Sequence, residues 1–313
     1  MSPYSSNKTL AKYLTQYAEP EQALLDGLPG QWRNALIIPA YREAASFLEL
    51  SKAARNKGKA LLILVLNEPC SSLEAPEQNS AEWISNITES LEPASWGQDM
   101  LSLHGNILLV NRTGSLAIPD KQGVGLARKI AADIACQLIA SGHIESPWIF
   151  STDADTTLPE DYFAVQQQAD DSSSLSNSGS TASKDRTGIT FAFEHTAPDN
   201  GEVFWPHQLY DWHMRYYVAG LAFAGSHYAY HSIGSCLAMH HIAYAQARGF
   251  PKRSGGEDFY MLNKLAKLGK IHKPQMPVLQ IQSRFSSRVP FGTGPATRQI
   301  FEAGLSEFTS YHP

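Results

Sequence analysis

Short apolar runs alternate with segments of helical periodicity over the first half of the chain. The runs are rich in Ile, Leu and Val and are too short for helices, which is typical of buried strands. They occupy residues 35–40, 60–66, 106–110 and 148–151. Apolar residues recur every four positions from Leu126 to Leu138, which predicts a helix with one stripe facing a sheet. This alternation predicts an α/β fold with a mostly parallel, doubly wound sheet.

The second half continues the pattern with less regular spacing. Strands are predicted at 188–193, 234–239 and 276–281, with helices between the last two. The aromatic-rich segment 204–230 has two compatible interpretations, a core helix that covers the sheet and a wall for a ring-shaped ligand.

Three stretches fall outside this pattern. Residues 1–33 are polar with a weakly amphipathic piece, so we expect a helical extension packed on the outside. Residues 169–187 nearly lack large apolar side chains and cannot offset the entropy of ordering, which predicts a mobile insertion. Residues 286–313 form a C-terminal tail.

Composition limits the classes of function. The chain has 313 residues, of which 43% are hydrophobic, and a formal charge of −5, as in an ordinary globular protein. This acidic balance gives no electrostatic support for nucleic-acid binding. Three widely spaced cysteines without a C-x-x-C pair indicate neither a disulfide framework nor a zinc site. Since we find no signal-peptide core and no apolar run of transmembrane length, we expect a cytoplasmic protein.

Two aspartates, Asp153 and Asp155, directly follow the strand at 148–151. In an extended chain both side chains point to the same side. Carboxylates held that close are expected to share a cation such as Mg²⁺ or Mn²⁺ with an anionic ligand. Alternatively, the pair forms an Asx-turn that caps a helix starting near Pro159. The pair alone does not decide between these interpretations.

Glu257 and Asp258 follow two glycines at the predicted start of a helix. Acidic residues at this position compensate the helix dipole, which is the structural interpretation. The chemical interpretation is a carboxylate that accepts the proton of an attacking hydroxyl group.

Four sequence motifs follow one another along the chain. They are the strand end Pro39-Ala40-Tyr41-Arg42-Glu43, the helix start Gly123-Val124-Gly125, Asp153-Ala154-Asp155, and Gly256-Glu257-Asp258. Over residues 34–285 this order resembles the family 2 glycosyltransferases of the GT-A fold. The resemblance implies a Rossmann-like fold in which helices flank a mostly parallel central sheet. It also implies a nucleotide-binding half at 34–160 and an acceptor half at 188–285.

The resemblance further implies an inverting, metal-dependent glycosyltransferase that moves one sugar from a nucleoside-diphosphate sugar to an acceptor hydroxyl. The Gln-x-x-Arg-Trp motif and transmembrane helices of processive members are not found, which favours a soluble enzyme. By this resemblance, Asp155 binds Mg²⁺ or Mn²⁺ directly, and Asp153 contacts the ribose or a metal-bound water. Asp258 is the implied base and Glu257 the second choice, while His272 is a candidate for a further metal ligand.

The nucleotide contacts implied by the resemblance are Pro39, Ala40, Tyr41, Glu43, Glu68, Arg128 and Asp153. The chain reads Asn67-Glu68-Pro69-Cys70 where the family often has Asp-Asp-Gly-Ser, so the nucleotide stays open. Arg284 and Arg288 are expected either to form a lid over the diphosphate or to belong to a plain surface tail. The sugar, the acceptor and the oligomeric state are not predicted.

Two alternative functions stay open. One is a nucleotidyltransferase, which would normally carry a Gly-rich, basic phosphate loop after the first strand. The other is a non-catalytic nucleotide- or sugar-binding protein on the same scaffold.

Overall fold

The computed structural model describes residues 7–74, 80–166, 186–196, 201–285, 292–304 and 308–309. The predicted mobile insertion at 169–187 therefore lies outside the described residues, except for Arg186 and Thr187 at the start of a strand. Arg288 lies outside them as well.

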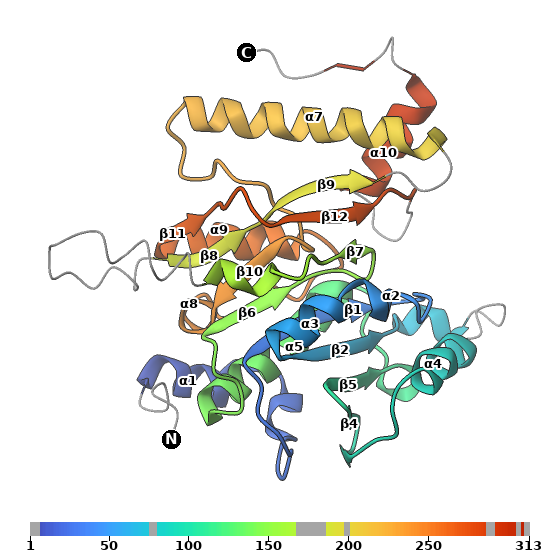
Figure 1. Ribbon diagram of the computed structural model, residues 1–313, viewed down its shortest axis with the longest axis vertical. Coiled ribbons are helices and arrows are strands. Elements are labelled where there is room, and N and C mark those ends of the chain that lie inside the picture. The colour runs from blue at the N-terminus through green and yellow to red at the C-terminus, as the bar shows by residue number, and fades with distance from the viewer. Residues whose placement is uncertain are drawn as a thin grey trace, which may run out of the picture.

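The main sheet of the described chain contains nine strands and is parallel at its centre (Figure 1). Its order is β11 (Lys270–His272), β8 (Arg186–Thr190), β10 (Leu237–His240), β6 (Trp148–Ser151), β1 (Asn34–Ala40), β2 (Ala60–Asn67), β5 (Ile107–Arg112), β4 (Leu101–His104) and β3 (Trp96–Gln98). β6, β1, β2 and β5 are parallel neighbours, whereas β10 is antiparallel to both β6 and β8. The predicted α/β class with a mostly parallel central sheet is thus confirmed.

The central strands are apolar throughout because both faces of the sheet are covered. Every residue of β1 and β2 is buried. Side chains alternate between two cores: Ile37 and Ile63 pack on one face, and Leu36 and Leu62 on the other. The predicted stripe from Leu126 to Leu138 lies on helix α5 (Gly123–Ser141) and is buried against the first of these faces.

The remaining helices lie around this sheet and above it (Figure 1). They are α1 (Lys8–Gln16), α2 (Phe47–Leu50), α3 (Lys52–Gly58), α4 (Ser80–Glu89), α7 (Gly201–Phe223), α8 (His241–Gln246), α9 (Glu257–Leu268) and α10 (Thr293–Ala303). Short 3₁₀ turns occupy Pro20–Ala23, Cys70–Glu74, Gly114–Leu116 and Tyr162–Ala164. In the described part of the chain, no helix combines the length and apolar character needed to cross a bilayer.

A second, smaller sheet corrects the prediction of one strand at 188–193. β8 ends at Thr190, and β9 (Ala192–Thr196) belongs to a sheet ordered β7 (Thr156–Thr157), β12 (Val278–Gln282) and β9. Between them, the N–H of Phe191 donates to Cys236 O at 2.9 Å. The chain therefore passes from one sheet to the other, and the small sheet lies between the main sheet and α7 (Figure 1).

The aromatic-rich segment forms α7, but only its first half belongs to the core. His207 and Asp211 are buried, whereas Trp212 is 71% exposed and Phe223 is 97% exposed. The predicted core helix is therefore wrong for the second half of α7.

The N-terminal helix α1 is tied to α5 by a buried polar cluster. Asp133 of α5 accepts hydrogen bonds from the hydroxyl groups of Tyr13 and Tyr244, the latter at 2.7 Å, and its Oδ2 lies 2.7 Å from Lys129 Nζ. The backbone N–H of Glu19 completes the cluster at 2.8 Å. Burial raises the pKa of Asp133, while the Lys129 ammonium opposes that shift.

Candidate functional site

A cavity of about 850 Å³ opens at the carboxyl ends of β1, β2 and β6, where ligands bind in open α/β sheets. Its volume suits a small-molecule ligand. The main sheet contributes the strand ends, and the small sheet and α7 close the opposite side with Ile281, His195, His207 and Met214. The loop before α9 and the first turns of α5, α9 and α10 complete the lining.

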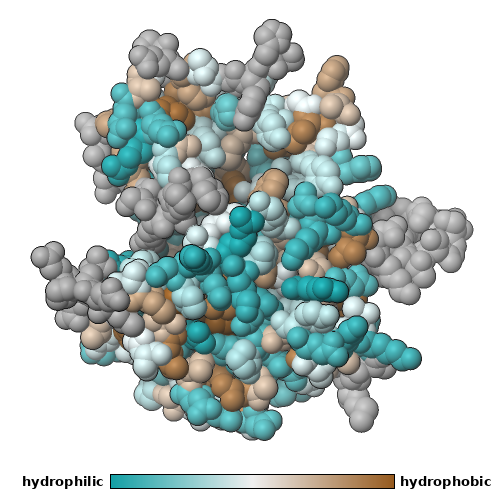
Figure 2. Space-filling model, turned by 180° about the vertical axis from the view of Figure 1, so that it is seen from behind, coloured by the Kyte–Doolittle hydropathy of each residue, from teal (hydrophilic) through white to brown (hydrophobic). Residues whose placement is uncertain are grey.

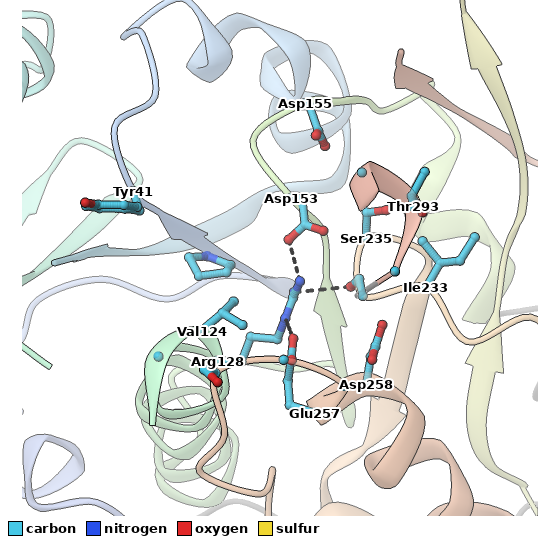
Figure 3. Close-up of a pocket in the computed structure, with 18 of the residues that line it drawn as sticks. Tyr41, Val124, Arg128, Asp153, Asp155, Ile233, Ser235, Glu257, Asp258 and Thr293 are labelled. Atoms are coloured by element: carbon cyan, nitrogen blue, oxygen red, sulfur yellow. Dashed lines mark hydrogen bonds and ion pairs between the residues drawn. The ribbon is translucent and has the colours of Figure 1, made fainter. Parts of the chain in front are cut away.

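Arg128 of α5 lies at the centre of this site and is almost fully buried (Figure 3). Its guanidinium contacts Asp153 and lies 2.8 Å from Glu257 Oε1. It also donates to Ser151 Oγ at 2.8 Å and to Gly234 O at 3.2 Å. Burial lowers the pKa of Arg128, but the two carboxylates outweigh it and leave that pKa above its ordinary value. The guanidinium of Arg128 thus links the end of β6 to the start of α9.

The position of Arg128 depends on a close approach of two chain segments. Gly125 donates its N–H to Arg253 O at 2.9 Å, and a Cβ atom there would lie 2.5 Å from Pro251 O. Any side chain at this position would push α5 away from the loop before α9. The predicted Gly123-Val124-Gly125 helix start therefore has a steric reason.

Asp153 and Asp155 do not lie side by side on an extended strand. The strand ends at Ser151, and the N–H of Thr156 donates to Asp153 O at 3.3 Å across a turn. Asp153 faces Arg128, whereas Asp155 lies farther from it (Figure 3). The expectation of an extended segment is wrong, because the chain must turn here to enter β7.

Asp155 is paired with a second arginine. Arg284 binds both oxygens of Glu43, at 3.0 and 3.1 Å, and lies 2.9 Å from Asp155 Oδ2. Burial and the nearby Asp153 raise the pKa of Asp155, while Arg284 opposes the shift. Of the two predicted positions for Arg284, the structure therefore places it inside the cavity rather than on a surface tail.

The two acidic residues at the start of α9 are in different environments. Both line the cavity, but Glu257 is buried and paired with Arg128, whereas Asp258 accepts the N–H of Phe259 at 2.7 Å. Burial and the neighbouring Glu257 raise the pKa of Asp258 to about 7, against the attraction of Arg128. Asp258 thus has the accessibility and the basicity of a proton acceptor near neutral pH.

The cavity offers hard oxygen donors to a cation, but its described residues do not form a complete set of metal ligands. Asp153 and Asp155 both line it. The described residues contain no group of three His, Cys, Asp or Glu side chains that could hold a metal ion. Mg²⁺ is usually held by one or two carboxylates together with water and substrate phosphates, so these two donors fit such an ion only with its ligand.

Three of the predicted residues are not brought to the cavity. Ala40 is packed in the core, and Glu68 is buried with its carboxylate accepting the N–H of Gly114 at 3.1 Å. His272 lies on the edge strand β11, three positions from β6 in the sheet order. Pro39, Tyr41 and Glu43 do line the cavity, as do both β6 aspartates and Arg128.

A histidine of the cavity wall, His195, is paired with the buried Asp211, and no sequence motif predicted this pair. His195 donates from Nδ1 to Asp211 Oδ1 at 2.7 Å, and the rings of His195 and His207 lie 5.1 Å apart. Burial lowers the pKa of His207 and favours its neutral form. The pair joins β9 to α7, two elements whose contact depends on the unpredicted second sheet.

Comparison with known proteins adds no family to this description. The chain matches no protein-family model, and a search of curated proteins found no match.

Proposed function

We propose that this protein is an inverting glycosyltransferase with a GT-A type of fold, which moves a sugar from a nucleoside-diphosphate sugar to an acceptor hydroxyl with the aid of Mg²⁺ or Mn²⁺. The observation that carries the proposal is the presence of Asp153, Asp155 and Asp258 in one cavity at the ends of the parallel strands. The first two come from the end of β6, and the third comes from the start of α9.

The charge of the cavity supports a cation-dependent ligand. Among the residues that the structure describes, six carboxylates line it against three guanidinium groups, which leaves an excess of negative charge. A diphosphate is itself an anion and would be repelled from such a cavity. Asp155 and Asp153 would hold a divalent cation, which would offset this repulsion and stabilise the charge that develops on the leaving diphosphate.

The donor is assigned to the side of the cavity formed by β1 and β2. Tyr41 offers a half-buried aromatic ring, and Pro39 and Asn67 lie on the same lining. We assign the nucleoside to these residues.

Asp258 is assigned the role of base. As the acceptor oxygen bonds to the anomeric carbon, the bond from that carbon to the diphosphate breaks, and the hydroxyl proton passes to Asp258. One displacement with one base inverts the configuration at the anomeric carbon. Glu257 has a separate role, because its pairing with Arg128 fixes the start of α9 beneath Asp258.

A thermal-shift screen of UDP-, GDP-, CDP- and dTDP-sugars with Mn²⁺ or EDTA tests the proposal. A nucleotide should raise the melting temperature only when the metal is present, and Asp155→Asn should remove the effect. With the donor found, Asp258→Asn should keep donor binding and lose transfer. Nucleotide binding unchanged by EDTA would contradict the metal assignment, and release of a sugar phosphate in place of the nucleoside diphosphate would identify a nucleotidyltransferase instead.

A further inference from the structure

The second half of α7 exposes apolar side chains where a water-facing helix normally carries polar ones. Trp212, Tyr216, Ala219 and Phe223 recur at helical spacing and are all exposed, Phe223 by 97%. Arg215 is the only charged residue from Trp212 to Phe223. Val218 and Leu221, on the other side, are half-buried. The helix is therefore apolar on its outer face as well as towards the molecule.

Two features of this stripe favour a lipid surface over a second copy of the chain. From Trp212 to Phe223 it is about 18 Å long and about 10 Å wide, a footprint of about 180 Å². Even if protruding side chains double this footprint, its area remains well below the about 800 Å² that each partner buries in a stable interface. Its large residues are Trp, Tyr and Phe, the types that are enriched where a membrane meets water.

We infer that the second half of α7 docks on the surface of a phospholipid membrane. The helix lies in the plane of the interface, with Trp212, Tyr216 and Phe223 at the boundary between headgroups and acyl chains. The upper end of the molecule, which carries α7, shows separate brown apolar side chains among teal and pale ones (Figure 2). Docking at this end requires no helix to cross the bilayer.

The same helix connects this surface with the cavity. Tyr210 lies two residues before Trp212, Met214 lies two residues after it, and both line the cavity. A membrane bound by the outer face of α7 would therefore lie across this helix from the cavity. The inference does not depend on the proposed transferase activity, since membrane binding needs neither donor nor turnover.

Co-sedimentation of the full chain with vesicles of phosphatidylcholine, with and without phosphatidylglycerol, tests the inference. We expect binding to both compositions because the contact is mainly apolar. Trp212→Ser with Phe223→Ser should weaken the partition coefficient at least tenfold, since each large side chain withdrawn from an apolar environment accounts for about that factor. Leu268→Ser is the matched control: Leu268 is 45% exposed at the end of α9, and its replacement should leave binding unchanged.

The melting temperature of the double variant should equal that of the wild type, because the replaced side chains contact mainly water. Absence of vesicle binding by the wild type would overturn the inference. So would binding that the double variant retains, or a dimer in light scattering that the double variant dissociates.

Discussion

Replacement of Arg128 by Met tests whether this arginine compensates the buried charges of the site. The Arg128 side chain is 3% exposed, and its partners Asp153 and Glu257 are 33% and 5% exposed. Removing one partner from a buried ion pair typically costs about 3–5 kcal/mol, because a charge is left without compensation. At about 2 °C per kcal/mol for a chain of this size, the melting temperature should fall by about 6–10 °C.

The cause of this loss can be separated from the loss of packing. Arg128→Met combined with Glu257→Gln should be more stable than Arg128→Met alone, because the second change removes an uncompensated charge. Scanning calorimetry or denaturant unfolding measures the difference between the two variants.

Lys57→Met serves as the control, because Lys57 pairs with Glu160 on the surface, where both side chains are at least 60% exposed. Such pairs contribute about 0–1 kcal/mol. If Arg128→Met melted like this control, or if Glu257→Gln added a further loss, the charge-compensation argument would be refuted.

Three further predictions follow from the same electrostatics. The pKa of Asp258 is raised to about 7, so its ionisation destabilises the fold increasingly as the pH rises from the ordinary carboxyl pKa to about 7. Asp258→Asn should therefore raise the melting temperature at about pH 8 and lose this advantage near pH 4. An equal gain in melting temperature at both pH values would contradict this prediction. Arg284→Gln removes a cation from Asp155, so calorimetry without nucleotide should show tighter Mn²⁺ binding; weaker binding would mean that Arg284 does not compete with the metal. Asp133→Asn removes the carboxylate that lies 2.7 Å from the buried Lys129 and leaves only Glu19, at 3.8 Å, to compensate this cation. It should cost up to about 3–5 kcal/mol of unfolding free energy, measured by urea titration; a loss below about 1 kcal/mol, as for a surface pair, would contradict this.

The central sheet could be predicted because its strands are covered on both faces. Such strands need Ile, Leu and Val at every position, and this leaves continuous apolar runs such as residues 60–66 in the sequence. The small sheet left no such signal, since β7 has two residues and β9 follows β8 after a single residue, Phe191. The aromatic content of α7 predicted a helix but not its exposure, because apolar residues on both faces of a helix indicate only that something covers them.

The candidate site was predictable as a set of residue types and not as a set of contacts. Asp153, Asp155 and Asp258 were identified from their positions at the ends of strands and the start of a helix. The pairing of Arg284 with Glu43 joins residues 241 positions apart, and nothing in local sequence specifies it. Arg128 was expected to meet phosphates, yet four protein oxygens already accept its hydrogen bonds.

These contacts give the acidic residues of the cavity unequal roles. Arg128 compensates Asp153 and Glu257, and Arg284 compensates Glu43 and Asp155. Asp258 forms no ion pair with a described residue, and its carboxylate faces the cavity beside a like charge. Because opposite charges hold carboxylates ionised while burial and like charges favour their protonation, Asp258 is the member of the group best suited to accept a proton near neutral pH. In the proposed function, Asp155 would bind a divalent cation only when Arg284 moves away, so the proposal couples metal binding to the position of Arg284.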